Sequence, residues 1–145
     1  VPGHGFVIAI PIKSVGGGKA VAYMNGDTKN AKYTPAINYD YELIVAISNE
    51  GSTDMVMNAA RAAGARGGTV LHGKGTGSKD APKFYNISIA DEKEVILIVS
   101  TAGQKAGIMR AILEKAGPDS KAGSIVFSIP TTEVAGFGVL DSSET

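Results

Sequence analysis

The sequence predicts an α+β domain of the ferredoxin-like type, with two helices on one face of an antiparallel four-stranded sheet. From Leu43 onward the hydrophobic patterns follow the order strand, helix, strand, loop, strand, helix, strand. Because β-α-β connections are right-handed almost without exception, two such units place both helices on the same sheet face. The other face needs a cover. Oligomerisation is the simplest cover, and a helix or the N-terminal strands are the alternatives.

The composition fits one soluble domain with appendages. The chain has 145 residues, 43% of them hydrophobic, which is enough to form a core. Fourteen basic residues balance fourteen acidic ones, so no overall field favours nucleic acid or an anionic membrane. The longest apolar runs fall far short of the roughly 20 residues of a membrane helix. We therefore predict no nucleic-acid partner and no membrane insertion, and the absence of cysteine agrees with a cytoplasmic location.

The first half of the chain predicts strands at both ends of a linker. Gly5–Lys13 is an apolar run typical of a strand, and Lys19–Met24 forms a second strand in a hairpin-like arrangement. Leu43–Ile47 is a short β-branched strand. Ser52 or Thr53 then caps a helix that Gly64 ends. One face of this helix carries small apolar residues: Val56, Ala59, Ala60 and Ala63.

The second half repeats the strand-helix-strand pattern. Thr69–His72 is a strand, Phe84–Ile89 is extended, Ala90–Lys93 is a turn, and Glu94–Ser100 is a strand buried on both faces. Thr101 and Gln104 form a capping box before a helix that Gly117-Pro118 stops. Its apolar stripe is Ile108, Met109, Ile112, Leu113 and Ala116. Ser124–Ile129 is the closing strand, ending at Pro130.

A similarity between the start and the end of the chain suggests a tandem protein. Setting Pro11 against Pro130 aligns Val7 with Val126 without a gap. This similarity between the two ends of the chain is expected if the chain derives from a tandem protein whose first repeat survives here only as its last strand. The alternative is a chance match of two apolar strands. A start at Val1 agrees with a trimmed or partial product. The predicted divisions are terminal strands at 1–25, a linker at 26–40, the domain at 41–139 and a tail at 140–145.

The best candidate site is the glycine-rich stretch after the Thr69–His72 strand. Backbone N–H groups of such a stretch can surround an anion, and lysines add charge. The residues concerned are Gly73, Lys74, Gly75, Thr76, Gly77, Ser78 and Lys79. The stretch is not a P-loop, because that motif needs glycine at position 78. A flexible solvent loop with two ordinary lysines is the alternative interpretation.

A second loop, Gly117–Gly123, offers Lys121 and leads into the last strand. If a partner subunit brings this loop near the first, a site forms between subunits. Catalytic signals are scarce: His4 and His72 lack metal-ligand spacing, and the pair Asp91 and Glu92 reads as solvated. We therefore predict neither a metal site nor an enzyme.

Several segments together resemble the PII signal-transduction family, the trimeric ferredoxin-like regulators of nitrogen metabolism. The similarity runs from about Glu42 to Gly138. It rests on five segments: Glu42–Val45, Ala59–Val70, Gly75–Gly77, Glu94–Val99 and Gly123–Pro130. The resemblance implies a cytoplasmic, non-enzymatic regulator. It also implies a homotrimer that binds adenine nucleotide between subunits and a protein target through the loop after the second domain strand.

The resemblance also assigns site residues. Thr69, Gly75, Gly77 and Gly123 match the family's backbone-type positions, and Ala122 lies beside Gly123 in the second loop. The positions of the family's arginine, glutamine and lysine carry Ser78, Lys79 and Ser124 instead, and its C-terminal arginines fall near 135–137. Losing charge-assisted phosphate contacts predicts weak binding of ATP or ADP. The loop also looks shorter, which argues against modification at a loop-tip tyrosine, because Tyr85 falls on the returning strand.

We predict a PII-like regulatory domain that binds a small anionic ligand or adenine nucleotide. The first alternative is a structural or protein-interaction module whose ligand site has decayed. A small ferredoxin-like enzyme is a weaker alternative because no nucleophile or acid-base pair is visible. An RNA-binding domain of this fold is weaker still because its aromatic strand motif is absent.

Overall fold

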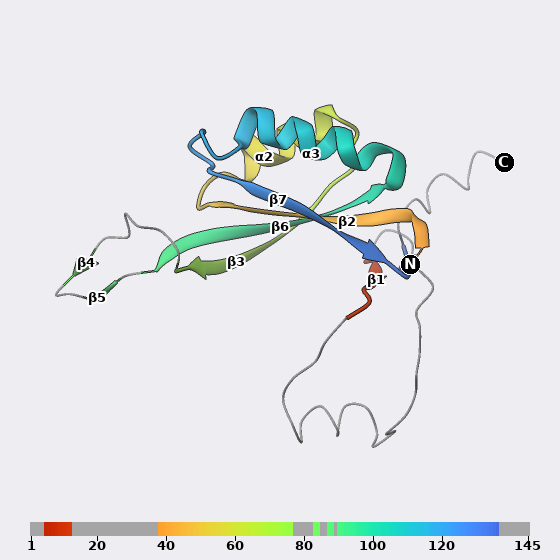
Figure 1. The fold of residues 1–145 in the computed structure, drawn as a ribbon, viewed down its shortest axis with the longest axis horizontal. Coiled ribbons are helices and arrows are strands. Elements are labelled where there is room, and N and C mark those ends of the chain that lie inside the picture. The colour runs from red at the N-terminus through yellow and green to blue at the C-terminus, as the bar shows by residue number, and fades with distance from the viewer. Residues whose placement is uncertain (1–4, 13–37, 77–82, 85–86, 89, 137–145) are drawn as a thin grey trace, which may run out of the picture. The chain divides into compact units, whose positions relative to one another are not determined.

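A computed structural model describes residues 5–12, 38–76, 83–84, 87–88 and 90–136 of the chain, and Figure 1 shows its elements. The chain divides into two compact units. The larger is Tyr39–Ile129, and the smaller combines Val1–Asn38 with Pro130–Thr145. Among the described residues, no helix has the length and apolar character needed to cross a membrane.

A four-stranded sheet with the order β3-β6-β2-β7 forms the base of the larger unit (Figure 1). Its strands are β2 (Asn38–Asn49), β3 (Thr69–Gly75), β6 (Asp91–Thr101) and β7 (Ile125–Thr131). Strand β6 pairs antiparallel with both β2 and β3, with apolar residues opposite one another, such as Val45 and Leu97. This is the predicted ferredoxin-like sheet.

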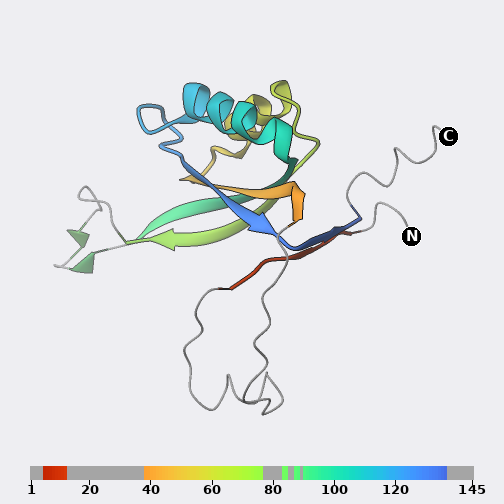
Figure 2. The same cartoon turned by 45° about the vertical axis from the view of Figure 1, so that its right-hand side comes forward.

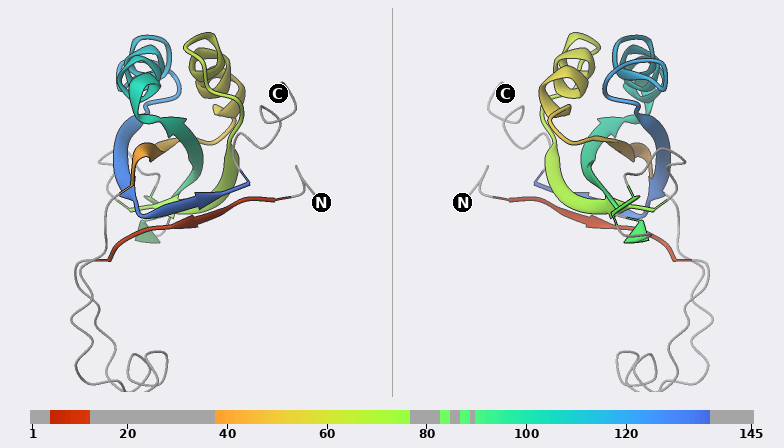
Figure 3. Two further views of the ribbon diagram at one scale, coloured as in Figure 1. Left: turned by 90° about the vertical axis from the view of Figure 1, so that its right-hand side faces the viewer. Right: turned by 90° about the vertical axis from the view of Figure 1, so that its left-hand side faces the viewer.

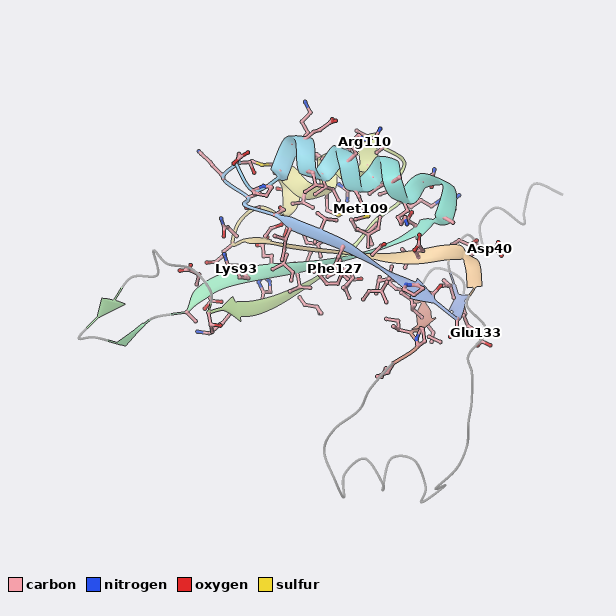
Figure 4. The ribbon with its side chains drawn as sticks, viewed as in Figure 1. Asp40, Lys93, Met109, Arg110, Phe127 and Glu133 are labelled. Atoms are coloured by element: carbon pink, nitrogen blue, oxygen red, sulfur yellow. The ribbon has the colours of Figure 1, made fainter. Side chains whose placement is uncertain are left out.

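Two helices, α2 (Thr53–Ala62) and α3 (Ala102–Ala116), lie side by side on one face of this sheet, as Figures 2 and 3 show. Met109 lies between α3 and the sheet, whereas Arg110 is on the outer side of α3 (Figure 4). Each large apolar side chain buried there contributes about 1.5–3 kcal/mol. The core comprises Ile44, Ala46, Val56, Met57, Ala60, Ala65, Ile96, Ile98, Ile108, Ile112, Ala116 and Ala122.

The helix ends agree with the sequence in position but not in every contact. Ser52 is the N-cap of α2, yet its side chain makes no capping hydrogen bond. Gly64 has a φ of +108°, a left-handed conformation that favours glycine, and it follows the C-cap as predicted. Thr101 is the N-cap of α3. Its hydroxyl bonds the Gln104 side chain at 3.1 Å, and its side chain makes no capping bond to the backbone.

Several predicted boundaries were wrong. The turn predicted at Ala90–Lys93 is a strand from Asp91 onward, where β6 begins, and residues 38–40, which the prediction placed at the end of the linker, begin β2. Strand β7 continues through Pro130, which is tolerated because β7 is an edge strand. Leu113 is 44% exposed and does not join the core.

Two small antiparallel pairs complete the described part of the chain. In the smaller unit, β1 (Val7–Ala9) pairs with β8 (Glu133–Ala135), a strand that the sequence did not predict. The predicted strand at Gly5–Lys13 is thus confirmed over three residues. The stretch Phe84–Ile89, predicted as extended, overlaps β4 (Lys83–Phe84) and contains β5 (Ile87–Ser88), and these two strands pair with each other. The predicted strand at Lys19–Met24 lies outside the described residues.

Candidate functional site

Residues 73–75 and 121–123 of the candidate site lie at one end of the sheet but on its two opposite edges, whereas Thr69 stands opposite Leu97 in the middle of β6. Thr69, Gly73, Lys74 and Gly75 belong to edge strand β3, whereas Lys121–Gly123 precede the other edge strand, β7. Two strands lie between these edges, so their backbones are separated by three inter-strand spacings, about 14 Å. One chain therefore does not bring the backbones of the two groups together around a small ligand.

The first part of the predicted anion loop is a strand. Gly73, Lys74 and Gly75 continue β3 and stand opposite Lys93, Glu92 and Asp91 of β6. Lys74 Nζ lies 3.1 Å from a Glu92 carboxylate oxygen, and both side chains are largely exposed, so the pair contributes less than about 1 kcal/mol. Thr76 is the first residue beyond the strand, and Gly77, Ser78 and Lys79 lie outside the described residues. The sequence predicted that residues 73–75 form a loop, and the structure shows instead that they belong to an edge strand.

The second loop is a folded turn attached to the end of β2. The N–H of Ser120 donates to the Gly117 carbonyl at 3.0 Å, and the N–H of Gly123 donates to the Ser120 carbonyl at 3.1 Å. Gly123 has a φ of +53°, where a side chain is strained. Asn49 holds the turn twice, because its Nδ2 donates to the Lys121 carbonyl at 3.0 Å and its N–H donates to the Ala122 carbonyl at 2.8 Å.

Lys93 connects the two parts of the site, and the sequence prediction missed it. Its backbone stands opposite Gly73 on one side and Asn49 on the other. Its ammonium group donates to Asn49 Oδ1 at 2.5 Å. Figure 4 places Lys93 at this end of the sheet. The signal available in the sequence is alternation: Lys93 shares a strand face with the apolar Val95 and Leu97 if the strand begins before Glu94.

Glu94 is a buried carboxylate at the same end of the sheet, and the sequence prediction did not identify it. Only 6% of it is exposed. Its two carboxylate oxygens accept hydrogen bonds from the Thr53 hydroxyl at 2.6 Å and the Gly51 N–H at 2.9 Å. The Thr53 bond, with backbone bonds at the start of α2, lowers the pKa of Glu94, whereas burial acts in the opposite direction. Glu94 therefore caps α2 from the neighbouring strand in place of Ser52.

The sheet face opposite the helices is apolar and partly open. Because Val126 packs against the core beneath the helices, its neighbours in β7 point to the other face. On this open face Leu71 is 49% exposed, Ile125 55% and Phe127 43%. Figure 4 shows Phe127 on the side of the sheet away from the helices. We call the surface formed by Leu71, Ile125 and Phe127 the open apolar face.

No group of three side chains suited to hold a metal ion occurs in the described part of the chain. His72 lies on β3 and is exposed rather than inside the core. Asp91 and Glu92 are consecutive strand residues, so their side chains point to opposite faces of the sheet. That alternation removes them as an acid-base pair.

The larger unit is thus a small ferredoxin-like domain with an open apolar sheet face. The family model of nitrogen regulatory protein P-II matches residues 41–137, well over half of the chain. The chain therefore belongs to the nitrogen regulatory protein P-II family, a family of signal-transduction regulators.

The fold is similar to that in a crystal structure of Arabidopsis thaliana PII bound to citrate, with a TM-score of 0.50. The two share 20% sequence identity, and the similarity covers 64% of this chain and 76% of that one. Among curated proteins, no sequence matches this chain.

Proposed function

We propose that this chain is a regulatory protein that forms a homotrimer and binds a small anionic ligand between its subunits. The observation that carries the proposal is the placement of the site residues on opposite edges of the sheet. A ligand held by both groups needs the β3 edge of one copy beside the 121–123 turn of another. Membership of the P-II family supports this arrangement.

The open apolar face supports the assembly. Leu71, Ile125 and Phe127 would lose their exposed area against a second copy, and burial of apolar area favours association. Such a contact would also bring the ends of the sheets close to one another, where the site residues lie. We propose that the loop after β3 presents a surface to a protein target in the cytoplasm.

The ligand class follows from the residues. Lys121 is exposed beside a turn closed by Gly123, and Lys93 donates to Asn49, whose side chain also holds that turn. Cations with nearby glycine backbone suit carboxylate or phosphate groups. The ligand candidates are ATP, ADP, 2-oxoglutarate and citrate, with nucleotide binding weakened by the serine at 78 and by Ser124. No catalytic pair of nucleophile and base has been identified among these residues, so we propose a binding role rather than catalysis.

Two measurements test this function. Light scattering coupled to size exclusion should give three times the mass of the chain, and a monomer would refute the assembly. Titration calorimetry with ATP, ADP, 2-oxoglutarate and citrate should give heat for at least one of them. No heat up to millimolar concentrations would refute the ligand site and favour the alternative of a protein-interaction module, here called the docking module.

That docking module is the second candidate, and one observation favours it. Lys74 is paired with Glu92, and Gly73–Gly75 are in a strand, so this part of the site is less open to an anion than a loop would be. In a docking module, charge-removing changes at Lys74 and Lys121 would leave partner binding intact.

A further inference from the structure

The pairing between β1 and β8 is specified by side chains as well as by the backbone. Ile8 stands opposite Val134 in the antiparallel ladder, and the two strands run side by side in Figure 3. Next to the ladder, the Ala9 carbonyl accepts hydrogen bonds from the Thr132 N–H at 2.9 Å and from the Thr132 hydroxyl at 3.2 Å. Gly136 has a φ of +90°, and a Cβ added there would lie 2.5 Å from a carbonyl oxygen of the segment that precedes β1. The glycine is thus required by the close approach of this segment.

The segment that contains β1 is apolar on both faces. Residues 5–12 carry no polar or charged side chain, which is typical of a strand buried on both faces. The side chains of Val7, Ile8 and Ala9 alternate between the two faces, yet none of them is buried. Val7 is 72% exposed, and Ile12, three residues beyond the strand, is 73% exposed. Because a two-stranded ribbon is marginally stable by itself, pairing within one copy leaves β1 without the cover that its composition needs.

A long connection joins β1 to the rest of the described chain. Twenty-five residues, 13–37, lie between Ile12 and Asn38, where β2 begins. A stretch of this length spans at most about 80–90 Å, which permits β1 to reach the β8 strand of a neighbouring copy as well as its own. The hydrogen bonds and the register of the ladder are the same in both arrangements. The choice between them therefore depends on the apolar area that each arrangement covers.

We propose that β1 of each copy pairs with β8 of a neighbouring copy and so links the subunits of the assembly. This inference rests on the proposed homotrimer, in which each copy donates one strand and accepts one, so that the exchanges close into a ring. Exchange places the apolar segment between two copies, and the faces that are exposed within one copy gain a cover. Strand β1 lies outside residues 41–137, which match the P-II family model, so the exchange adds a contact to the family domain.

Disulfide cross-linking between two distinguishable chains tests the exchange. The sequence has no cysteine, so introduced thiols are the only ones present. Full-length Ile8→Cys and Val134→Cys chains are co-expressed with different affinity tags, purified together and oxidised. Directly opposed strand residues have Cα atoms about 4.5–5.5 Å apart, which suits a disulfide. About three quarters of randomly mixed trimers hold both chains, and one ladder in each of these carries both thiols, so about half of all chains should be linked.

Two further preparations make the result specific. Ile12→Cys replaces Ile8→Cys in the matched control, because Ile12 is in the same apolar segment and exposed but lies outside the ladder. Random collisions would link position 12 to position 134 as readily as position 8, whereas the register should leave position 12 unlinked. In the double variant Ile8→Cys/Val134→Cys, exchange should give covalent dimers and trimers. Pairing within one copy would instead give a monomer with an internal disulfide.

The outcomes separate the two proposals. If the wild-type chain is a monomer in light scattering, the proposed assembly fails and this inference fails with it. If the wild type is a trimer but the mixed chains stay unlinked while the double variant forms an internal disulfide, only the exchange is overturned. Equal linking of positions 8 and 12, or no disulfide in any preparation, would overturn it as well. Mixed dimers in which mass spectrometry finds position 8 joined to position 134, absent from the control, would establish the exchange.

Discussion

Glu94→Gln should destabilise the domain because Glu94 joins β6 to the start of α2. Its carboxylate accepts hydrogen bonds from the Thr53 hydroxyl and the Gly51 N–H, and its side chain is buried. A glutamine has one accepting oxygen instead of two and turns an N–H₂ group toward one of these donors. Losing one charged hydrogen bond and leaving a donor unmatched costs about 1.5–3 kcal/mol. For a domain of this size the melting temperature should fall by about 5–15 °C.

The pH dependence gives the prediction a second readout. The folded state lowers the pKa of Glu94 from its ordinary value of 4.5, so the charged carboxylate stabilises the fold. This contribution is fully present above the unfolded pKa and is lost as the pH falls through the lower, folded pKa. The difference between wild type and Glu94→Gln should therefore be constant near neutral pH and should shrink as the pH falls below about 4.5.

The assay is urea unfolding followed by circular dichroism from pH 7 to pH 3, at one fixed protein concentration because assembly shifts apparent stability. Glu92→Gln is the matched control. It changes the same residue type two positions away on the same strand face, but at an exposed pair with Lys74, and should cost less than about 1 kcal/mol. Equal losses in the two variants, or a Glu94→Gln difference that persists unchanged into acid, would refute the capping role.

Three further predictions concern the core, the turn and the open face. Ile112→Ala should cost about 2–5 kcal/mol in urea unfolding, because Ile112 is fully buried, whereas Leu113→Ala should cost under about 1 kcal/mol; similar losses would contradict the assignment of the core. Gly123→Ala should destabilise by about 1–2 kcal/mol because of its left-handed φ, whereas Gly107→Ala in α3 should stabilise by about 0.5–1 kcal/mol; the opposite order would disprove the turn geometry. Phe127→Glu should convert the proposed trimer to monomer in light scattering while leaving the circular dichroism spectrum unchanged, and an unchanged mass would show that the open apolar face is not the interface.

The sequence predicted the fold well because hydrophobic periodicity reports which face of each element is buried. Both helices begin and end within a residue or two of the predicted positions, since glycine and proline mark their ends locally. Leu113 was misplaced for a related reason. A 3.6-residue stripe is wider than the contact that α3 makes with the sheet, so residues at the edge of the stripe stay exposed.

The site was harder to predict because its geometry depends on strand register. The Gly73–Gly75 stretch has the composition of a loop, yet three consecutive residues of β6 stand opposite it and extend the ladder. That the 121–123 turn and β3 lie on opposite edges of the sheet follows from the strand order, which residue composition does not reveal. Ligand binding by these residues stays a prediction.

The run Asp91-Glu92-Lys93-Glu94 shows why local composition fails at this end of the sheet. Four consecutive charged residues are typical of a solvated turn, because isolated charges resist burial in a strand. Three of them instead meet partners from distant segments: Glu92 meets Lys74, Lys93 meets Asn49, and Glu94 meets Thr53 and Gly51. Since strand alternation sends Lys93 to the open face and the two glutamates to the helix face, the same run can anchor α2 and position a cation beside the candidate site. These partners lie 18 to 44 residues away in sequence, so only the folded register reveals them.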